Sequence, residues 1–340
     1  MRYQLASTPM SLRPKAATVL GVLGAHPLFF AKQGNRHPLG VYNLTFRDIV
    51  RHMAHVLDEL DKAANETTYA NPANYDWNRD LLNATDHLLN AIVQHLDSFA
   101  TIVEAFFESK GNEVAERIKK SIKCEVRPYR DHVAKIVNAI KHRHAKLASF
   151  YFHDVGLFVP GYFVEGVCEG GAIGPDPTVH GDSNSAISFN RDLPFHMVNL
   201  YFASGILGGA IQGLLRSTPR NTDIELSNTD RELGEVMRRL STMSRMYFPD
   251  EMSMAMPLVE YRGAIGKRDF SILLEYPAQR IRARAIPAGC RAQVSWSGDG
   301  ASRTFKVPYW ASAEGTRSSG TRRSKGKRSL PGRGGSAPRS

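Results

Sequence analysis

The strongest constraint on the fold is a run of apolar residues that recur every three or four positions over residues 77–106. This spacing places the apolar residues on one side of an α-helix. A helix with one apolar side must bury that side against other elements, so the run predicts a helix within a packed bundle. Gly111 is predicted to end this helix. The stripe consists of Trp77, Leu81, Leu82, Leu88, Leu89, Ile92, Leu96, Phe99, Val103 and Phe106.

A similar period precedes this helix. Asn43 or Thr45 is predicted to cap a helix, because short polar side chains accept hydrogen bonds from the free amides of the first turn. Apolar residues then recur through Leu60, and the breaking segment "NPANYD" follows at 71–76. The pattern therefore predicts a second bundle helix upstream of the first.

More helical sequence lies downstream, beginning near Asn112. Pro128 is expected to kink or split this segment, because proline lacks an amide donor and clashes with the preceding turn. A separate helix is predicted from about Tyr129 to Phe150. Several long helices with short connections predict an antiparallel bundle over residues 43–152.

The composition changes after His153. The segment "GLFVPGYFVEGV", followed by "CEGG", predicts strands joined by a glycine turn, and the block 258–310 also has strand-like sequence, with a hairpin around Gly298–Gly300. Helices are predicted at 193–215 and at about 229–246. The expected fold class is α+β: residues 1–42 packed on the body, a helical bundle at 43–152, a mixed α/β region at 153–312 and a disordered basic tail at 313–340.

The positive charge of the chain is concentrated at its end. The net charge is +11, and the residues from Gly315 onward contain eight basic and no acidic side chains, which leaves about +3 for the preceding 314 residues. A segment with so few apolar residues cannot offset its ordering entropy. The tail, more than the folded body, therefore predicts binding to polyanions.

Cysteine usage indicates a reducing compartment. The three cysteines, Cys124, Cys168 and Cys290, lie far apart without a CxxC pair. This argues against a disulfide framework and against a zinc ribbon, and it favours a cytoplasmic location.

The apolar run at 193–215 has the length of a membrane span, with glycines at four-residue spacing. Its polar residues would be costly in lipid, so we expect a helix buried in a protein core and no membrane span. The residues that would be costly in lipid are Pro194, His196, Asn199 and Gln212.

The densest polar cluster in the chain is "RPYRDHVAKIVNAIKHRHAKL", which starts at Arg127. Its basic residues are spread over more than one side of the predicted helix. His144 falls within the apolar stripe, which makes it either a hydrogen-bonded core histidine or a functional one. The remainder of the cluster is a solvated basic surface or a binding face.

At these residues the chain resembles the HEPN superfamily of helical-bundle proteins, many of which are metal-independent endoribonucleases of toxin, anti-phage or RNA-processing systems. The family motif is an arginine followed four to six residues later by a histidine, near the start of a late bundle helix. Arg127 and His132 match this spacing and location, and "NAIKHRH" resembles the last helix of non-catalytic bundles of this type. The resemblance covers about residues 43–150.

The resemblance implies a catalytic set of Arg127, His132, Asn138 and His142. In such a site, arginine stabilises the charge that develops on the phosphorane, and histidine moves a proton between the 2′-hydroxyl and the leaving oxygen. Among the residues that resemble HEPN domains, Pro128 stands where active members usually have a polar residue. Domains of this type often dimerise, so a homodimer through the bundle is also expected.

A second constellation consists of Asp176, His180 and Asp182, beside His153 and Asp154. Such residues could bind a divalent metal, but Asp beside Pro and Gly also forms turns. The turn interpretation is favoured, so no metal is expected. The sequence contains no Walker loop, no GxSxG and no HExxH, and no cofactor is expected.

The leading prediction is a non-catalytic, HEPN-like intracellular protein that associates with RNA or another polyanion through its tail and its basic helix. One alternative is an endoribonuclease of a toxin or anti-phage system, and another is a scaffold that pairs through the bundle. The segment "RIRARA" alternates by two, which places its arginines on one face of a strand. The predicted phosphate-binding residues are Arg280, Arg282, Arg284, Arg322, Arg323, Lys325, Lys327 and Arg328.

Overall fold

The computed structural model describes residues 2–5, 12–23, 28–69, 77–215, 228–263, 270–277, 283–296 and 298–310. Its fold class is α+β, as the sequence predicts. Residues Met1–Pro308 form one compact unit. A second unit spans Tyr309–Ser340, of which the structure describes Tyr309 and Trp310, so the predicted disorder of the tail concerns residues outside the described part.

Three long helices follow one another in the first half of the chain: α2 (Pro38–Tyr69), α3 (Trp77–Glu104) and α4 (Glu113–Arg143). The predicted packed helices are therefore present. Helix α2 begins earlier than its expected caps, at Pro38, because proline has its φ angle preset for the first helical position. Nδ1 of His37 accepts the hydrogen bond of the Leu39 amide at 3.2 Å. Helix α3 ends at Glu104, before the predicted stop at Gly111.

Helix α4 is continuous through Pro128, so the prediction of two helices here is wrong. Pro128 lies on the exposed side of α4. The carbonyl that loses its amide partner there can be hydrated, which lowers the cost of proline inside a helix. The helix also ends earlier than expected. His144 adopts the left-handed conformation with φ of 54°, and residues from Leu147 onward form a strand instead of continuing to Phe150.

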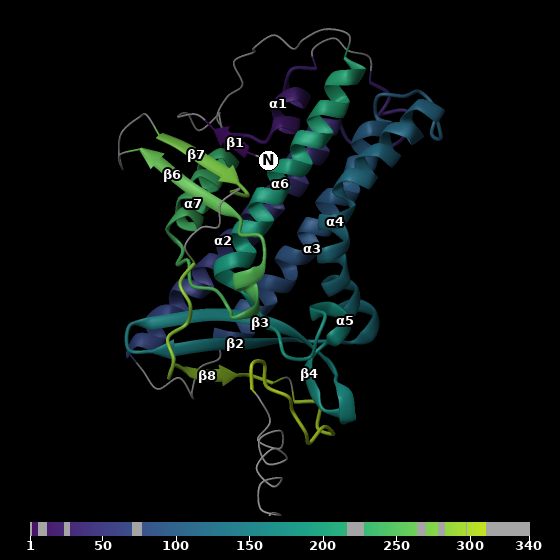
Figure 1. Cartoon of the computed structure of the whole chain (residues 1–340). Helices are drawn as coiled ribbons and strands as arrows, with labels where there is room; N and C mark the ends of the chain where they lie inside the picture. The colour runs from purple at the N-terminus through teal and green to yellow at the C-terminus, as the bar shows by residue number, and fades with distance from the viewer. Residues whose placement is uncertain are drawn as a thin grey trace, which may run out of the picture. The chain divides into compact units, whose positions relative to one another are not determined.

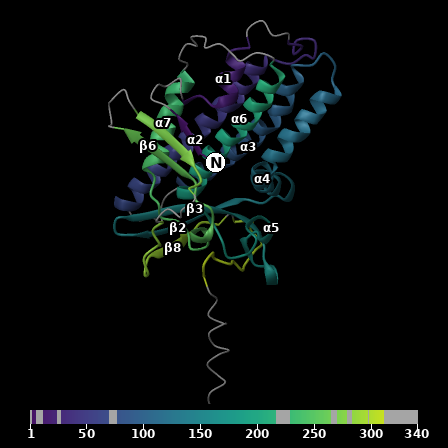
Figure 2. The ribbon, with the colours of Figure 1, turned by 45° about the horizontal axis from the view of Figure 1, so that its top comes forward.

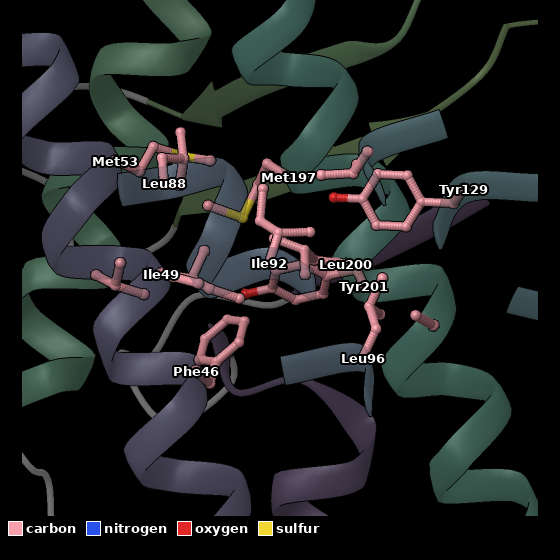
Figure 3. Packing of buried hydrophobic residues seen from close by; sticks show 14 of the residues in the cluster. Phe46, Ile49, Met53, Leu88, Ile92, Leu96, Tyr129, Met197, Leu200 and Tyr201 are labelled. Atoms are coloured by element: carbon pink, nitrogen blue, oxygen red, sulfur yellow. The ribbon is translucent and has the colours of Figure 1, made fainter. Parts of the chain in front are cut away.

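Helix α6 (Phe189–Leu214) lies alongside α2, α3 and α4 (Figures 1 and 2). It is apolar around most of its circumference, as expected for a central helix. Gly208 permits the close approach of α1 (Lys15–Gly21), because a Cβ atom there would lie 3.1 Å from the amide nitrogen of Ala16. The shared core appears in Figure 3, with Phe46, Ile49, Met53, Leu88, Ile92, Leu96, Tyr129, Met197, Leu200 and Tyr201.

An antiparallel sheet crosses one end of these helices (Figures 1 and 2). Its order is β4-β3-β2-β8, and β5 also pairs with β3. The bounds are β2 (Leu147–Asp154), β3 (Leu157–Val167), β4 (Ile173–Pro175), β5 (Ile187–Ser188) and β8 (Arg291–Val294). The predicted glycine turn lies between β3 and β4, where Gly170 and Gly171 have positive φ.

The hairpin predicted around Gly298–Gly300 is wrong. Strand β8 pairs with β2, and Phe305 forms a bridge with Ile173. The segments on the two sides of the turn therefore pair with different strands, because each finds an unpaired edge in the sheet.

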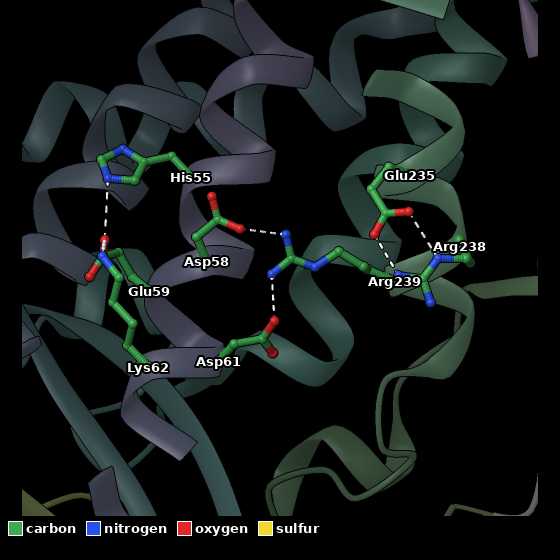
Figure 4. Close-up of polar contacts among 8 residues, drawn as sticks. All are labelled: His55, Asp58, Glu59, Asp61, Lys62, Glu235, Arg238 and Arg239. Atoms are coloured by element: carbon green, nitrogen blue, oxygen red, sulfur yellow. Dashed lines mark hydrogen bonds and ion pairs between the residues drawn. The ribbon is translucent and has the colours of Figure 1, made fainter. Parts of the chain in front are cut away.

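A second sheet has the order β1-β7-β6, with β1 (Arg2–Leu5), β6 (Leu258–Gly263) and β7 (Phe270–Glu275). Helix α7 (Asn228–Thr242) packs against β6 and against α2. Two ion pairs fix α7 to α2: the guanidinium of Arg239 lies 2.6 Å from a carboxylate oxygen of Asp58 and 2.7 Å from one of Asp61 (Figure 4). Two short helical elements are α5 (Pro177–His180) and the 3-10 helix η4 (Asp250–Ser253).

Candidate functional site

Helix α4 contains more lysines and arginines than any other helix that the structure describes. Within Glu113–Arg143 there are nine lysines and arginines and four acidic residues. The apolar residues of α4 are buried against α3 and α6, so most of the cations lie on the opposite side. The exposed cations are Arg117, Lys120, Lys123, Arg127, Lys135, Lys141 and Arg143.

Local sequence explains why α4 is formed as one helix. The side chain of Asn112 accepts hydrogen bonds from the amides of Val114 at 2.9 Å and Ala115 at 3.3 Å, which caps the N-terminus. Glu113 lies in the first turn, and the last turn contains three basic residues. Both arrangements oppose the helix dipole favourably.

The predicted catalytic residues do not meet at one point. Arg127 is 71% exposed and forms an ion pair with Asp131 on its own helix at 3.0 Å. Asn138 and His142 are exposed as well. Among the described residues, no hydrogen bond or ion pair joins Arg127 to His132, Asn138 or His142. His144, expected within the apolar stripe, lies beyond the helix and is exposed.

His132 is also exposed, but it lies on a different side of α4, next to α6. Its ring is edge-on to the ring of Phe195, with 5.2 Å between centroids. The guanidinium of Arg191 lies 5.4 Å from the centroid of the same phenyl ring. Loss of hydration lowers the pKa of His132; Asp192 opposes this shift, and nearby positive groups, including Lys135, reinforce it.

His180 on α5 faces the same region. Its Nε2 accepts the hydrogen bond of the Val164 amide at 3.0 Å. Burial lowers the pKa of His180 to about 4, against the opposing effect of Asp176 and Asp182. A nitrogen that accepts the hydrogen bond of a backbone amide has no free lone pair for a proton, so His180 joins α5 to β3.

The carboxylates of Asp176 and Asp182, considered above as metal ligands, take part in turns and in one ion pair. Asp176 accepts hydrogen bonds from the amide and the hydroxyl of Thr178, at 2.7 and 2.6 Å, and pairs with Arg143 at 2.8 Å. Asp182 accepts from the amide of Asn184 and the hydroxyl of Ser185. Within the described ranges, no group of three or more histidine, cysteine or acidic side chains is arranged to hold a metal ion.

A buried polar network behind α4 was not predicted from the sequence. The hydroxyl of Tyr162 donates to Asp192 at 2.8 Å, and Nε2 of His196 lies 3.3 Å from the same carboxylate oxygen. The hydroxyl of Tyr129 lies 3.2 Å from Nδ1 of His196. Burial acts to raise the pKa of Asp192, but His196 and the hydrogen bond from Tyr162 outweigh it and leave the pKa lowered. The network thus joins α4, α6 and β3.

Of the arginines in "RIRARA", the structure describes Arg284. Its amide donates to the carbonyl of Arg245 at 2.9 Å, and its side chain is exposed. The other predicted phosphate-binding residues lie outside the described residues: Arg280, Arg282, Arg322, Arg323, Lys325, Lys327 and Arg328.

One helix in the described part of the chain, α6, is long and apolar enough to cross a membrane by length and composition. Of its most apolar window, 56% is buried inside the protein, and the core helix of a soluble protein meets the same criteria.

Comparison of the chain with family models, with curated proteins and with solved structures found no match in any of the three.

Proposed function

We propose that the protein associates with RNA or another polyanion inside the cell, without cleaving it, through the exposed basic face of α4 and the basic segment after Gly315. The observation that supports this proposal is the set of exposed cations along α4. For Lys120, Lys123 and Lys141, no ion pair occurs with any residue that the structure describes. Such cations are available to phosphates.

The arrangement of these cations favours a polymer over a small anion. A helix rises about 1.5 Å per residue, so Lys120 and Lys141 lie roughly 30 Å apart along α4. A single phosphate cannot contact both. An extended chain of phosphates can, and its binding releases counterions from each neutralised position.

The non-catalytic part of the proposal rests on the positions of Arg127 and His132. Arginine and histidine must both reach one phosphate to share a cleavage reaction, and Arg127 is 71% exposed and paired with Asp131 on the outward side of α4. His132 packs against Phe195 of α6 instead. RNA is the partner that the resemblance to HEPN domains implies.

The test is fluorescence anisotropy of a labelled single-stranded RNA with two matched triple variants. The first is Lys120→Gln, Lys123→Gln, Lys141→Gln on α4. The second removes the same charge elsewhere, in Lys32→Gln, Lys62→Gln, Arg238→Gln, where each cation pairs with a carboxylate. The α4 variant is expected to bind RNA at least about tenfold more weakly than the control variant. Equal affinities would remove α4 from the proposal.

Two further experiments test the role of the tail and the absence of RNA cleavage. Deletion of residues 315–340 is expected to weaken RNA binding, because eight cations are lost. RNA should remain intact during prolonged incubation in EDTA. Cleavage that is abolished by His132→Ala would contradict the non-catalytic proposal and support a metal-independent endoribonuclease.

A further inference from the structure

A groove of about 580 Å³ lies between α3 and the first half of α4. Pockets of roughly 300 to 1,000 Å³ are typical of small-molecule sites. The apolar part of its lining comes from both helices: Leu96, Phe99 and Ala100 on α3, and Ile122 and Val126 on α4. Ala100 is exposed, whereas the other four are buried, so the groove is open above Ala100 and has an apolar floor.

Two of the cations at the rim are already neutralised. The ammonium of Lys119 lies 2.6 Å from Glu104 and 2.5 Å from Glu116. The guanidinium of Arg130 lies 2.7 Å from Asp97. Hydrogen bonds to these carboxylates act to raise the pKa of Lys119, against burial, and that of Arg130, so both groups remain charged and paired.

Lys120 and Lys123 line the same groove and differ from the paired cations. Both are exposed, and neither forms a hydrogen bond or an ion pair with any residue in the described part of the chain. Residues three apart on a helix lie on one side, about 5–6 Å apart at Cβ. One anionic group can therefore be shared by both ammonium groups.

We propose that this groove binds an amphipathic anion: an acyl chain that carries a carboxylate or phosphate head. The apolar chain would displace water from the floor formed by Phe99, Ile122 and Val126. The anionic head would lie at the rim between Lys120 and Lys123. Burial of apolar surface supplies the affinity, and the two ammonium groups select a charged head over a neutral one.

Such a ligand could be a free fatty acid or an anionic lipid of a membrane, and the two sources are separated by two assays. The first titrates the full chain with a fluorescently labelled dodecanoic acid below its micellar concentration. The second measures sedimentation of the full chain with vesicles of phosphatidylglycerol, compared with vesicles of phosphatidylcholine. Saturable binding to the free acid alone assigns a soluble ligand. Sedimentation with phosphatidylglycerol alone assigns a membrane lipid if Ala100→Phe, which keeps the basic tail, loses it.

The decisive variant is Ala100→Phe, which fills the groove from an exposed helical position and leaves the buried residues in place. Gln94→Phe is the matched control, because Gln94 is also exposed on α3 and does not line the groove. Ala100→Phe is expected to weaken binding of the probe about tenfold or more, and Gln94→Phe to leave it unchanged.

Head-group selectivity provides the second test. The unmodified protein is expected to bind dodecanoate about tenfold or more tightly than dodecanol, and Lys120→Ala with Lys123→Ala should remove most of that preference. The proposal is overturned if the protein neither binds dodecanoate saturably nor sediments with phosphatidylglycerol, if Ala100→Phe binds as the unmodified protein does, or if the double variant keeps the full preference. Lys120 and Lys123 belong both to this groove and to the proposed RNA-binding face of α4. Ala100→Phe keeps both lysines, so RNA binding that is retained while probe binding is lost would assign the loss to the groove.

Discussion

The buried network of Asp192, His196, Tyr129 and Tyr162 shows what can be predicted at single residues. Asp192 and His196 are four apart in an apolar run, and this spacing places them on one side of a helix. A polar pair in such a run must find partners, so its importance was predictable. The identity of those partners was not, because Tyr129 and Tyr162 come from a different helix and from a strand.

Glu251 is a second buried polar residue, on η4. Its carboxylate accepts hydrogen bonds from the amide of Ser188 at 3.0 Å, from the hydroxyl of Ser188 at 2.5 Å and from the amide of Phe248 at 2.9 Å. Burial raises its pKa to about 7, although these hydrogen bonds and Arg191 oppose the shift. Glu251 therefore connects the start of α6 to the segment after α7. Because it is buried, its ionised form lowers the stability of the folded protein.

The variant Glu251→Gln tests whether ionisation of Glu251 destabilises the folded protein. The pKa is raised on folding from its ordinary 4.5 to about 7, so between these values the folded protein binds more protons than the unfolded chain. The free energy of unfolding therefore falls as pH rises through this window. Glutamine does not titrate, so the variant should lose roughly 2–3 kcal/mol of this pH dependence.

The measurement is urea denaturation at pH 5 and pH 7.5, with the exposed Glu169→Gln as control. The control should keep the pH dependence of the unmodified protein. If Glu251→Gln kept it too, Glu251 would not be the group responsible.

At the scale of elements, the sequence predicted helices better than their ends. The apolar stripe of α4 continues in register to Leu147, which led to the prediction of a helix through Phe150. The actual end is a left-handed His144, with the amide of Ala145 bonded to the carbonyl of Ala139. Most helices that end this way use glycine, so a histidine gave no stop signal. The strand after it pairs with β3 in a hairpin and with β8, and the pairing with the distant β8 is not a local property.

The N-terminal cap of α4 leads to an element-scale prediction. Asn112→Ala removes the acceptor of two amide hydrogen bonds, at Val114 and Ala115, and should lower the free energy of unfolding by about 1 kcal/mol. Asn138→Ala, at an exposed position inside the same helix, should change it by less than about 0.5 kcal/mol. Chemical denaturation compares the two, and equal losses would show that the cap does not stabilise α4.

At the scale of the whole molecule, the fold class followed from the order of helical and strand-like sequence. The pairing of β1 with β7 and of β2 with β8 did not, because these partners are far apart along the chain. The same holds for the contact of Tyr42 with Ser204, whose hydroxyl groups lie 2.9 Å apart between α2 and α6. Local patterns contain little information about such distant contacts.

A truncation tests the division of the chain into units. Residues Met1–Pro308 form one compact unit, so deletion of residues 315–340 should leave the cooperative unfolding transition of the rest unchanged within about 0.5 kcal/mol. Thermal unfolding followed by circular dichroism measures this. A clear loss of stability would show that the tail contributes to the fold, and would change the interpretation of its effect on RNA binding.

The central claim, that cations of α4 contact phosphates, is tested most directly by the salt dependence of RNA affinity. Each phosphate contact to single-stranded RNA contributes about 0.7 to the slope of log affinity against log salt concentration. Lys120→Gln, Lys123→Gln, Lys141→Gln in the full chain should therefore reduce the magnitude of the slope by about 2, and Lys32→Gln, Lys62→Gln, Arg238→Gln should leave it unchanged. Equal slopes for the two variants would contradict the claim that α4 binds the polyanion.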